Sequence, residues 1–285
     1  MTDPPLLEAR RLGKRIGRRL VFSGIDLSVH GGRVVAIAGA NGSGKSTLLR
    51  VLSGSSAPTQ GTLRSAVSDR ALVPERFVPP DHMTPLAYLL HMERLRGRRT
   101  ADVRGRAVAL LEELQVTDPA TAMLEELSKG NAQKVAIAQA FLSACPLVFL
   151  DEPNTGLDDA ATSVLHGLIR AAVATGAAVV LTEHERTRSV RPDEQYELLD
   201  GRLSPSEIDV GAGEPTVLVE LSHPLGAQSV GVERLPRVRS VSSADGGARS
   251  FQVESGRVDQ FLRAALDDGW SVIVVRPALE NGGPR

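Results

Sequence analysis

The sequence predicts an α/β fold in which a mixed or parallel β-sheet is built around one phosphate-binding loop. Residues 39–47 read Gly-Ala-Asn-Gly-Ser-Gly-Lys-Ser-Thr, after an apolar run at 34–38 and before apolar residues at helical spacing. Further along, apolar runs at 147–150 and 177–182 flank an Ala-rich helical stretch, which is typical of a parallel sheet covered by helices. Residues 6–38 alternate in short runs between glycines, which predicts an antiparallel β part at the N-terminus.

The glycine-rich loop fits the pattern G-x-x-x-x-G-K-[ST]. Glycines let consecutive backbone N–H groups turn toward one anion, and the following helix directs its positive end to the same place. Lys45 supplies a mobile cation, and the Ser46 hydroxyl is a ligand for Mg²⁺. A strand before the loop and a helix after it argue against a chance glycine turn. We therefore expect a P-loop NTPase core that binds nucleotide through Gly39, Asn41, Gly42, Ser43, Gly44, Lys45, Ser46 and Thr47.

The composition limits the classes of function. A net charge of −1 and 3% aromatic residues disfavour a nucleic-acid surface. The single cysteine, Cys145, excludes an intramolecular disulfide and is expected in the core. No run approaches the ~18 apolar residues of a membrane-spanning helix, and residues 1–5 carry no apolar signal segment. Any action at a membrane is therefore expected to need a partner.

Two domains are expected within the 285 residues. Residues 1–205 are predicted to form the nucleotide-binding domain, and residues 206–285 a small α+β accessory domain after linker-like Ser, Pro and Gly residues. Residues 54–61 read as turns, and residues 84–127 as a helical insertion. In the second domain the predicted strands are 217–221, 238–242, 251–253 and 270–275, with a helix near 258–267.

Paired carboxylates follow the apolar run 147–150. Asp151 stands where a Mg²⁺ ligand is needed, and Glu152 is suited to orient or deprotonate the attacking water. The alternative is an acidic strand end exposed to solvent. The next predicted strand ends near His184, and parallel strands bring their carboxyl ends to one edge, where ligands bind. We therefore expect both strand ends to face the phosphate loop.

These motifs, in this order, resemble those of the nucleotide-binding subunits of ABC transporters over roughly residues 6–203. Leu-Ser-Lys-Gly-Asn at 127–131 is similar to the family signature LSGGQ, residues 154–158 to the D-loop, and His184 to the switch histidine. The resemblance implies an ATPase with catalytic Glu152 and His184. Taken alone, a histidine at position 184 would more often be a core or capped histidine.

The resemblance also implies a head-to-tail homodimer. In the family, the signature binds the γ-phosphate held by the other subunit, which assigns nucleotide contacts to Ser128 and Gly130, and Asp158 acts across the interface. Viewed alone, Ser128 is an ordinary helix cap and Asp158 an N-cap. A separate transmembrane permease is implied as the second partner, which would hold this chain at the cytoplasmic face of the cell membrane.

Two residues depart from the family pattern. Ile16 stands where an aromatic residue commonly stacks on adenine, so an aliphatic contact is expected. Glu75 replaces the Q-loop glutamine, and its carboxylate is expected to reach Mg²⁺. This substitution and the Ser-Lys-Gly signature are similar to subfamilies that export drugs and polysaccharides, as is the tail beyond residue 206. Its ending, residues 281–285, departs from the Leu-x-x-x-Phe-like close of those proteins.

Other interpretations compete with that of a transporter subunit. A soluble ABC protein acting on ribosomes or DNA would usually carry two cassettes or a long coiled coil, and an ATP-dependent interaction module would lack Glu152. The surface around Glu75 and residues 84–117 is expected to dock the permease through the arginine-rich segment from Arg94 to Arg106. A solvated arginine face is the alternative.

Overall fold

The computed structural model describes residues 4–183, 190–206, 216–222, 238–243, 248–254, 258–267 and 269–277. The chain divides into two compact units, Met1–Ile208 and Asp209–Arg285. In the parts of both units that are described, no helix combines the length and the apolar character needed to cross a bilayer.

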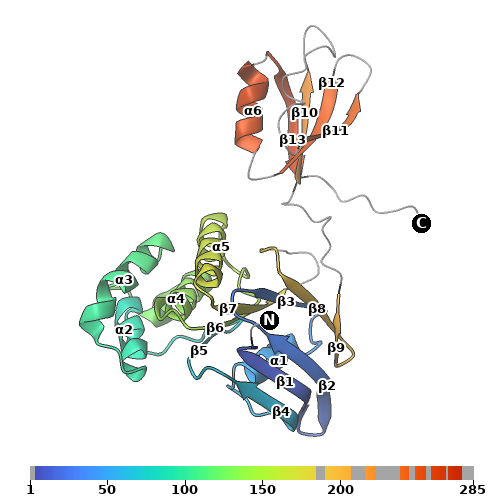
Figure 1. The fold of residues 1–285 in the computed structure, drawn as a ribbon. Coiled ribbons are helices and arrows are strands. Elements are labelled where there is room, and N and C mark those ends of the chain that lie inside the picture. The colour runs from blue at the N-terminus through green and yellow to red at the C-terminus, as the bar shows by residue number, and fades with distance from the viewer. Residues whose placement is uncertain are drawn as a thin grey trace. The chain divides into compact units, whose positions relative to one another are not determined.

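A six-stranded sheet forms the centre of the first unit (Figure 1), in the order β5-β6-β7-β3-β8-β9. Its first five strands are parallel, and β9 pairs antiparallel with β8. The strands are β3 (Val34–Ala38), β5 (Arg70–Val73), β6 (Leu147–Asp151), β7 (Ala178–Glu183), β8 (Glu194–Leu199) and β9 (Arg202–Pro205). The predicted α/β sheet is thereby confirmed, and the carboxyl ends of β3, β6 and β7 share one edge.

Alternate residues of β6 enter two different cores. Val148 and Leu150 pack into one core with α4 (Lys129–Leu142) and α5 (Asp159–Ala174). Leu147 and Phe149 pack into the other, with α1 (Lys45–Leu52). The central strands are therefore apolar on both faces because both faces are covered.

The three-stranded antiparallel sheet β2-β1-β4 completes the second core. Strands β1 (Leu7–Ile16) and β2 (Arg19–Val29) continue through Gly13 and Gly24, which were expected to separate short runs. The pairing of the two strands shifts register near both glycines. The third strand, β4 (Gln60–Ser65), overlaps the stretch 54–61 predicted as turns, so that prediction is wrong at its end. Leu63 is the only large apolar residue of β4, and alternation therefore could not mark it as a strand.

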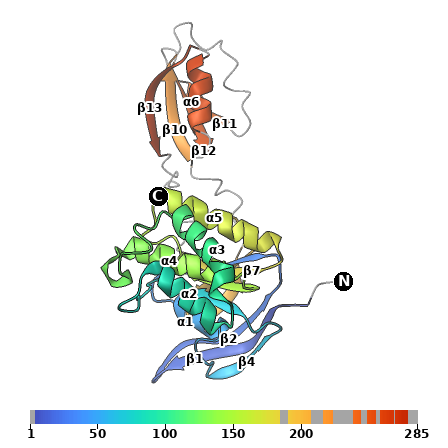
Figure 2. The same cartoon turned by 90° about the vertical axis from the view of Figure 1, so that its left-hand side faces the viewer.

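The helical insertion lies beside α4 (Figures 1 and 2). It contains α2 (Pro85–Leu95), α3 (Thr100–Glu113) and the short 3₁₀ helix η1 (Leu124–Glu126). Thr84 caps α2 by accepting from the Ala87 N–H, and Pro85 occupies the first helical position. Leucines from α2 and α3 join the core around α4.

Several arginines of this insertion bind within the protein. Arg96 donates to Cys145 Sγ at 2.9 Å, and Arg98 donates to the Ser143 carbonyl oxygen at 2.8 Å. Arg106 donates to the Phe141 carbonyl oxygen at 3.1 Å. Cys145 itself is buried, as predicted. Arg96, Arg98 and Arg106 therefore tie the insertion to the end of α4. The docking role expected of this arginine segment stays a prediction.

The second unit has a four-stranded antiparallel sheet in the order β11-β12-β10-β13. Its elements are β10 (Thr216–Ser222), β11 (Val238–Ser243), β12 (Ala248–Glu254), α6 (Val258–Asp267) and β13 (Ser271–Pro277). Its core contains Phe251, Phe261 and Trp270, with ring centroids 5.4 Å apart for the two phenylalanines. The predicted α+β character of this part is confirmed.

Candidate functional site

A pocket of about 620 Å³ opens at the phosphate loop. Its walls come from the end of β1, the start of β2, the loop before α1, the first turn of α1 and the residues that follow β5 and β6. The lining residues are Ile16, Arg19, Val21, Asn41, Gly42, Gly44, Lys45, Ser46, Thr47, Glu75, Glu152 and Thr155.

The backbone of the loop requires glycine. Gly39, Gly42 and Gly44 have φ of +152°, +77° and +107°, a region that residues with a Cβ atom rarely adopt. A Cβ atom at Gly39 would lie 2.7 Å from the Leu198 carbonyl oxygen. The Ser43 hydroxyl is buried without a hydrogen-bond partner among the described residues. A buried polar group without a partner calls for an explanation, and a phosphate oxygen would supply that partner.

Lys45 is held inside the loop. Its side chain is 4% exposed, and Nζ donates to the carbonyl oxygens of Gly39 at 2.7 Å and Ala40 at 3.2 Å. Nζ also lies 3.5 Å from Glu152 Oε1. The ammonium group thus stands between the loop and the carboxylate, at a place suited to phosphate oxygens.

Two neighbouring strand ends bring oxygen ligands together. Ser46 Oγ donates to Asp151 Oδ1 at 3.1 Å, and Thr182 Oγ1 donates to the same oxygen at 2.8 Å. The Glu152 N–H donates to Thr182 Oγ1 at 3.0 Å. Hydroxyl and carboxylate oxygens are the ligand atoms that Mg²⁺ prefers. The pair formed by Ser46 and Asp151 therefore fits this ion.

Glu152 has an unusual backbone. Its φ of +47° lies in the left-handed region, which costs a non-glycine residue of order 1–3 kcal/mol. The hydrogen bond to Thr182 supports this conformation, and the carboxylate faces the pocket beside Lys45. Backbone strain of this kind is common at active sites, which agrees with a catalytic role for the Glu152 side chain.

The structure brings most of the predicted nucleotide contacts to one pocket. Ile16, which is 59% exposed, and the exposed Glu75 both line it. Sequence reasoning missed Arg19, Val21 and Thr155 on the wall, and Thr182 behind the carboxylates. Only Thr182 had a signal, since it ends a predicted buried strand one step from Glu183. His184 lies outside the described residues.

Ser128 and Asp158 are helix caps, as the simpler interpretation proposed. Ser128 Oγ accepts from the Asn131 N–H at 3.2 Å, and Asp158 Oδ1 accepts from the Ala161 N–H at 2.8 Å. Among the described residues, those that line the nucleotide pocket include neither of them, nor Gly130. A second role for Ser128 and Asp158 would therefore have to be performed toward another molecule.

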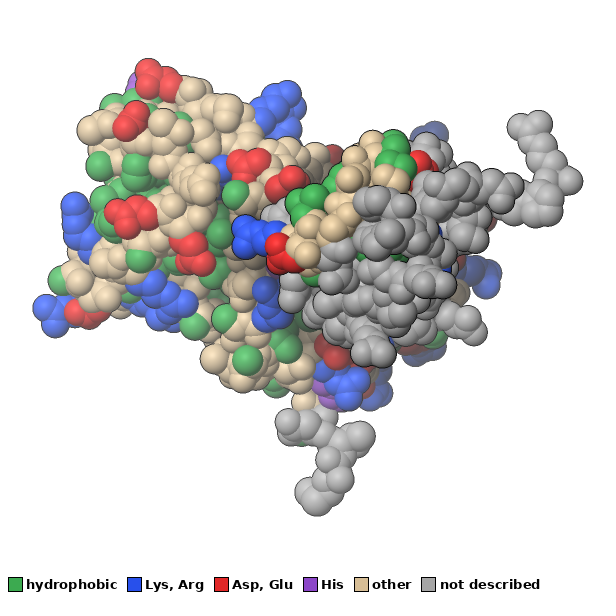
Figure 3. Space-filling model, turned by 90° about the horizontal axis from the view of Figure 1, so that it is seen from above, with side chains coloured by type: hydrophobic (Ala, Val, Ile, Leu, Met, Phe, Trp, Pro, Cys, Tyr) green, Lys and Arg blue, Asp and Glu red, His purple; other side chains and the backbone are tan. Residues whose placement is uncertain are grey.

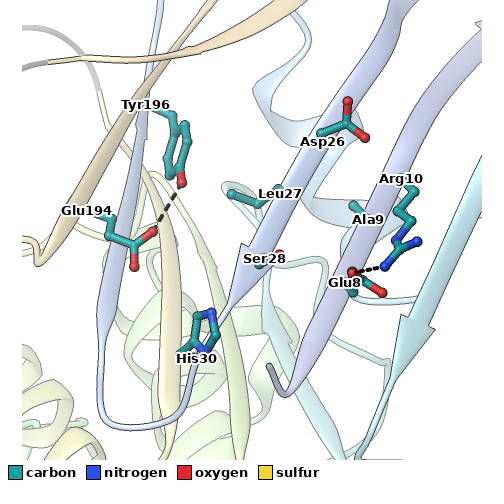
Figure 4. Close-up of a pocket in the computed structure, with 9 residues that line it drawn as sticks. All are labelled: Glu8, Ala9, Arg10, Asp26, Leu27, Ser28, His30, Glu194 and Tyr196. Atoms are coloured by element: carbon teal, nitrogen blue, oxygen red, sulfur yellow. Dashed lines mark hydrogen bonds and ion pairs between the residues drawn. The ribbon is translucent and has the colours of Figure 1, made fainter. Parts of the chain in front are cut away.

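A second groove of about 450 Å³ lies between β1, β2 and β8 (Figure 4). Its polar groups largely bind one another: Arg10 pairs with Glu8 at 2.7 Å, and Tyr196 donates to Glu194 at 3.1 Å. Asp26 accepts from the Arg11 N–H at 2.8 Å. On the face seen in Figure 3, acidic and basic side chains are interspersed. Because the polar groups of the groove largely bind one another, we assign no ligand to it.

The phosphate loop, the buried lysine and the paired carboxylates together define a nucleoside triphosphatase. The family model described as ABC transporter matches residues 22–155. The chain is 36% identical over 219 residues to the lipoprotein-releasing system ATP-binding protein LolD of Xanthomonas campestris pv. campestris (strain 8004), which spans 70% of this chain and 92% of that protein.

A second relative is the Nod factor export ATP-binding protein I of Cupriavidus pinatubonensis (strain JMP 134 / LMG 1197). It is 30% identical over 229 residues, which span 75% of this chain and 68% of the relative. A solved dimeric ATP-binding cassette in a post-hydrolysis state with ADP and Pi has the same fold, with a TM-score of 0.63, 21% identity and coverage of 71% and 98%. The chain belongs to the ABC transporter family. It is an ATP-binding subunit that hydrolyses ATP.

Proposed function

We propose that this subunit hydrolyses ATP with Mg²⁺ in a head-to-tail homodimer and drives export through a separate transmembrane subunit at the cytoplasmic face of the cell membrane. The observation that carries the dimer is the division of anion-binding groups on one chain. Lys45 and Ser46 line the pocket, whereas Ser128 and Gly130 lie at the N-terminus of α4 and are not among its described lining residues.

One chain cannot bring both groups to one nucleotide while folded. Every residue from Ala132 to Leu142 of α4 is buried, so moving the helix toward its own phosphate loop would expose a large part of the core. A helix N-terminus is a ready site for an anion. A second copy, related by a two-fold axis, would place each α4 N-terminus at the other copy's phosphates. The dimeric cassette with the same fold supports this arrangement.

In this proposal Ser46 and Asp151 would hold Mg²⁺, with Glu75 as a further oxygen ligand. Bound Mg²⁺ supplies charge neutralisation for the phosphate oxygens. Glu152 accepts a proton from the attacking water, and Lys45 exchanges its loop carbonyl contacts for phosphate oxygens. His184 is assigned the γ-phosphate contact on the family resemblance.

Export is supported by the name of one relative, Nod factor export ATP-binding protein I, and by Glu75 with the Ser-Lys-Gly signature. The permease is proposed to dock beside Glu75, on the exposed side of the insertion. Arg94 and Arg99 of the insertion are exposed and are proposed to contact a polar partner. To test export, inside-out membrane vesicles that contain this subunit and a co-expressed permease are given ATP from outside. ATP-dependent uptake of cargo into these vesicles supports export. Uptake only into right-side-out vesicles contradicts it.

The dimer is tested with Glu152→Gln, which retains ATP binding but cannot accept the proton. Light scattering after gel filtration with ATP and Mg²⁺ is expected to give a mass twice that of the chain. Adding Ser128→Arg should return the protein to a monomer, because the new side chain blocks the N-terminus of α4. Adding Ser55→Arg, at an exposed serine elsewhere, is the matched control and should leave the dimer intact. A monomer for Glu152→Gln alone defeats the proposal.

A further inference from the structure

Lys134 on α4 is a buried lysine paired with a carboxylate on another element. Its side chain is 7% exposed, and Nζ donates to Asp158 Oδ2 at 2.8 Å. Burial of an ammonium group is unfavourable unless an anion compensates it. Asp158 is 56% exposed, and the hydrogen bond from Lys134 holds the pKa of its carboxyl below the usual range. An exposed carboxylate is therefore anchored to a buried cation.

Both carboxylate oxygens of Asp158 are engaged. Oδ2 accepts from Lys134, and Oδ1 accepts from the Ala161 N–H at the start of α5. A helix cap needs only one of these oxygens. The second contact thus has another effect: it fixes the residues just before α5 against α4, and it sets the orientation of the carboxylate.

A second contact on the same face of α4 involves the residues just before α5. A Cβ atom at Gly130 would lie 2.6 Å from the Gly156 carbonyl oxygen, so only glycine permits this approach. Gly130 and Lys134 are four residues apart, which places them on one face of a helix. The segment from Asn154 to Asp158 thus contacts α4 at two points, by the ion pair of Asp158 and by the close approach of Gly156.

The neighbouring residue on α4 reaches toward the nucleotide pocket. Gln133 is buried, and its Nε2 donates to the Pro74 carbonyl oxygen at 3.1 Å. Glu75, the next residue, lines that pocket. Helix α4 therefore has Ser128 as its N-cap, contacts the residue before Glu75 through Gln133 and contacts Asp158 through Lys134.

We infer that Lys134 is a positioning residue for ATP hydrolysis: it holds Asp158 and the loop before it in the orientation required at the partner subunit's nucleotide. This inference rests on the proposed head-to-tail dimer. Lys134 acts through Asp158, since it is not among the described residues that line the pocket. Its removal should therefore affect turnover more than ATP binding.

The test uses the full chain with ATP and Mg²⁺. Lys134→Met is expected to leave KM within about twofold and to lower kcat by about ten- to hundredfold, the effect of a small misplacement of a functional group. Lys134→Arg keeps the cation and should restore most of kcat. Arg106→Met is the matched control, because it removes a hydrogen bond to the other end of α4 and should leave kcat unchanged.

Asp158→Asn keeps a cap for α5 but loses the negative charge that pairs with Lys134. This variant replaces Lys134→Met in the test if Lys134→Met does not fold. It should lower kcat like Lys134→Met, and the double variant should be no worse than either single variant. Wild-type kcat in a folded Lys134→Met protein, or fully additive losses, overturns the inference. If the inference about Lys134 fails but the Glu152→Gln protein forms a dimer with ATP, the proposed function still holds. If the Glu152→Gln protein does not form a dimer, both the proposed function and the inference about Lys134 are contradicted.

Discussion

Thr182 is expected to stabilise the catalytic edge of the sheet through its hydroxyl alone. The side chain is fully buried, donates to Asp151 Oδ1 at 2.8 Å and accepts from the Glu152 N–H at 3.0 Å. Thr182→Val removes the hydroxyl with little change of volume. The variant therefore tests these two hydrogen bonds rather than packing.

The magnitude follows from the two partners. A hydrogen bond to a charged group contributes about 1.5–3 kcal/mol and a neutral one about 0.5–1.5 kcal/mol. Asp151 keeps Ser46 as a donor, so we expect a loss of about 2–4 kcal/mol in the free energy of unfolding. Glu152, freed from its anchor at φ +47°, should also relax, and kcat should fall about tenfold.

Urea unfolding followed by far-UV circular dichroism measures the change, since the midpoint and slope yield the free energy. The only tryptophan, Trp270, lies in the second unit. Tryptophan fluorescence therefore reports that unit, and its transition should stay where it is in the wild type. This makes it an internal control for the localisation of the effect.

Thr175→Val is the matched substitution. Thr175 is exposed and donates only to the Ala172 carbonyl oxygen near the end of α5, so its loss should stay within about 0.5 kcal/mol, as for an ordinary surface substitution. A Thr182→Val protein that is as stable as the Thr175→Val protein, with wild-type kcat, would refute the reasoning about the strand ends.

Further outcomes follow from the same geometry. Lys45→Ala should abolish or severely weaken ATP binding in an equilibrium titration, and unchanged affinity would remove Lys45 from the site. Because Ile16 stands where the family stacks an aromatic residue, competition binding should show ATP preferred over GTP by less than about a hundredfold, or roughly 2.7 kcal/mol; a larger ratio contradicts this. Arg98→Glu should lower the melting temperature, since Arg98 donates to the Ser143 carbonyl oxygen. Arg99→Glu should instead weaken co-purification with the permease while basal ATP hydrolysis stays intact, and a normal complex would move the docking surface elsewhere.

The sequence by itself determined the α/β fold, the position of the phosphate loop and the strand that ends at Asp151. These features are local: a glycine pattern between a strand and a helix, and apolar runs whose length and flanking residues mark buried strands. The antiparallel strands were harder to predict. Gly13 and Gly24 look like breaks, and β4 has too few apolar residues to alternate.

Only the tertiary structure decided which side chains support the site. Asp151 and Thr182 are 31 residues apart, and they meet because parallel strands β6 and β7 place them in register. Lys134 and Asp158 are 24 residues apart, and they meet because α4 packs beside α5. Periodicity describes each element alone. The register between elements depends on how all the buried side chains pack together, and no short stretch of sequence contains that information.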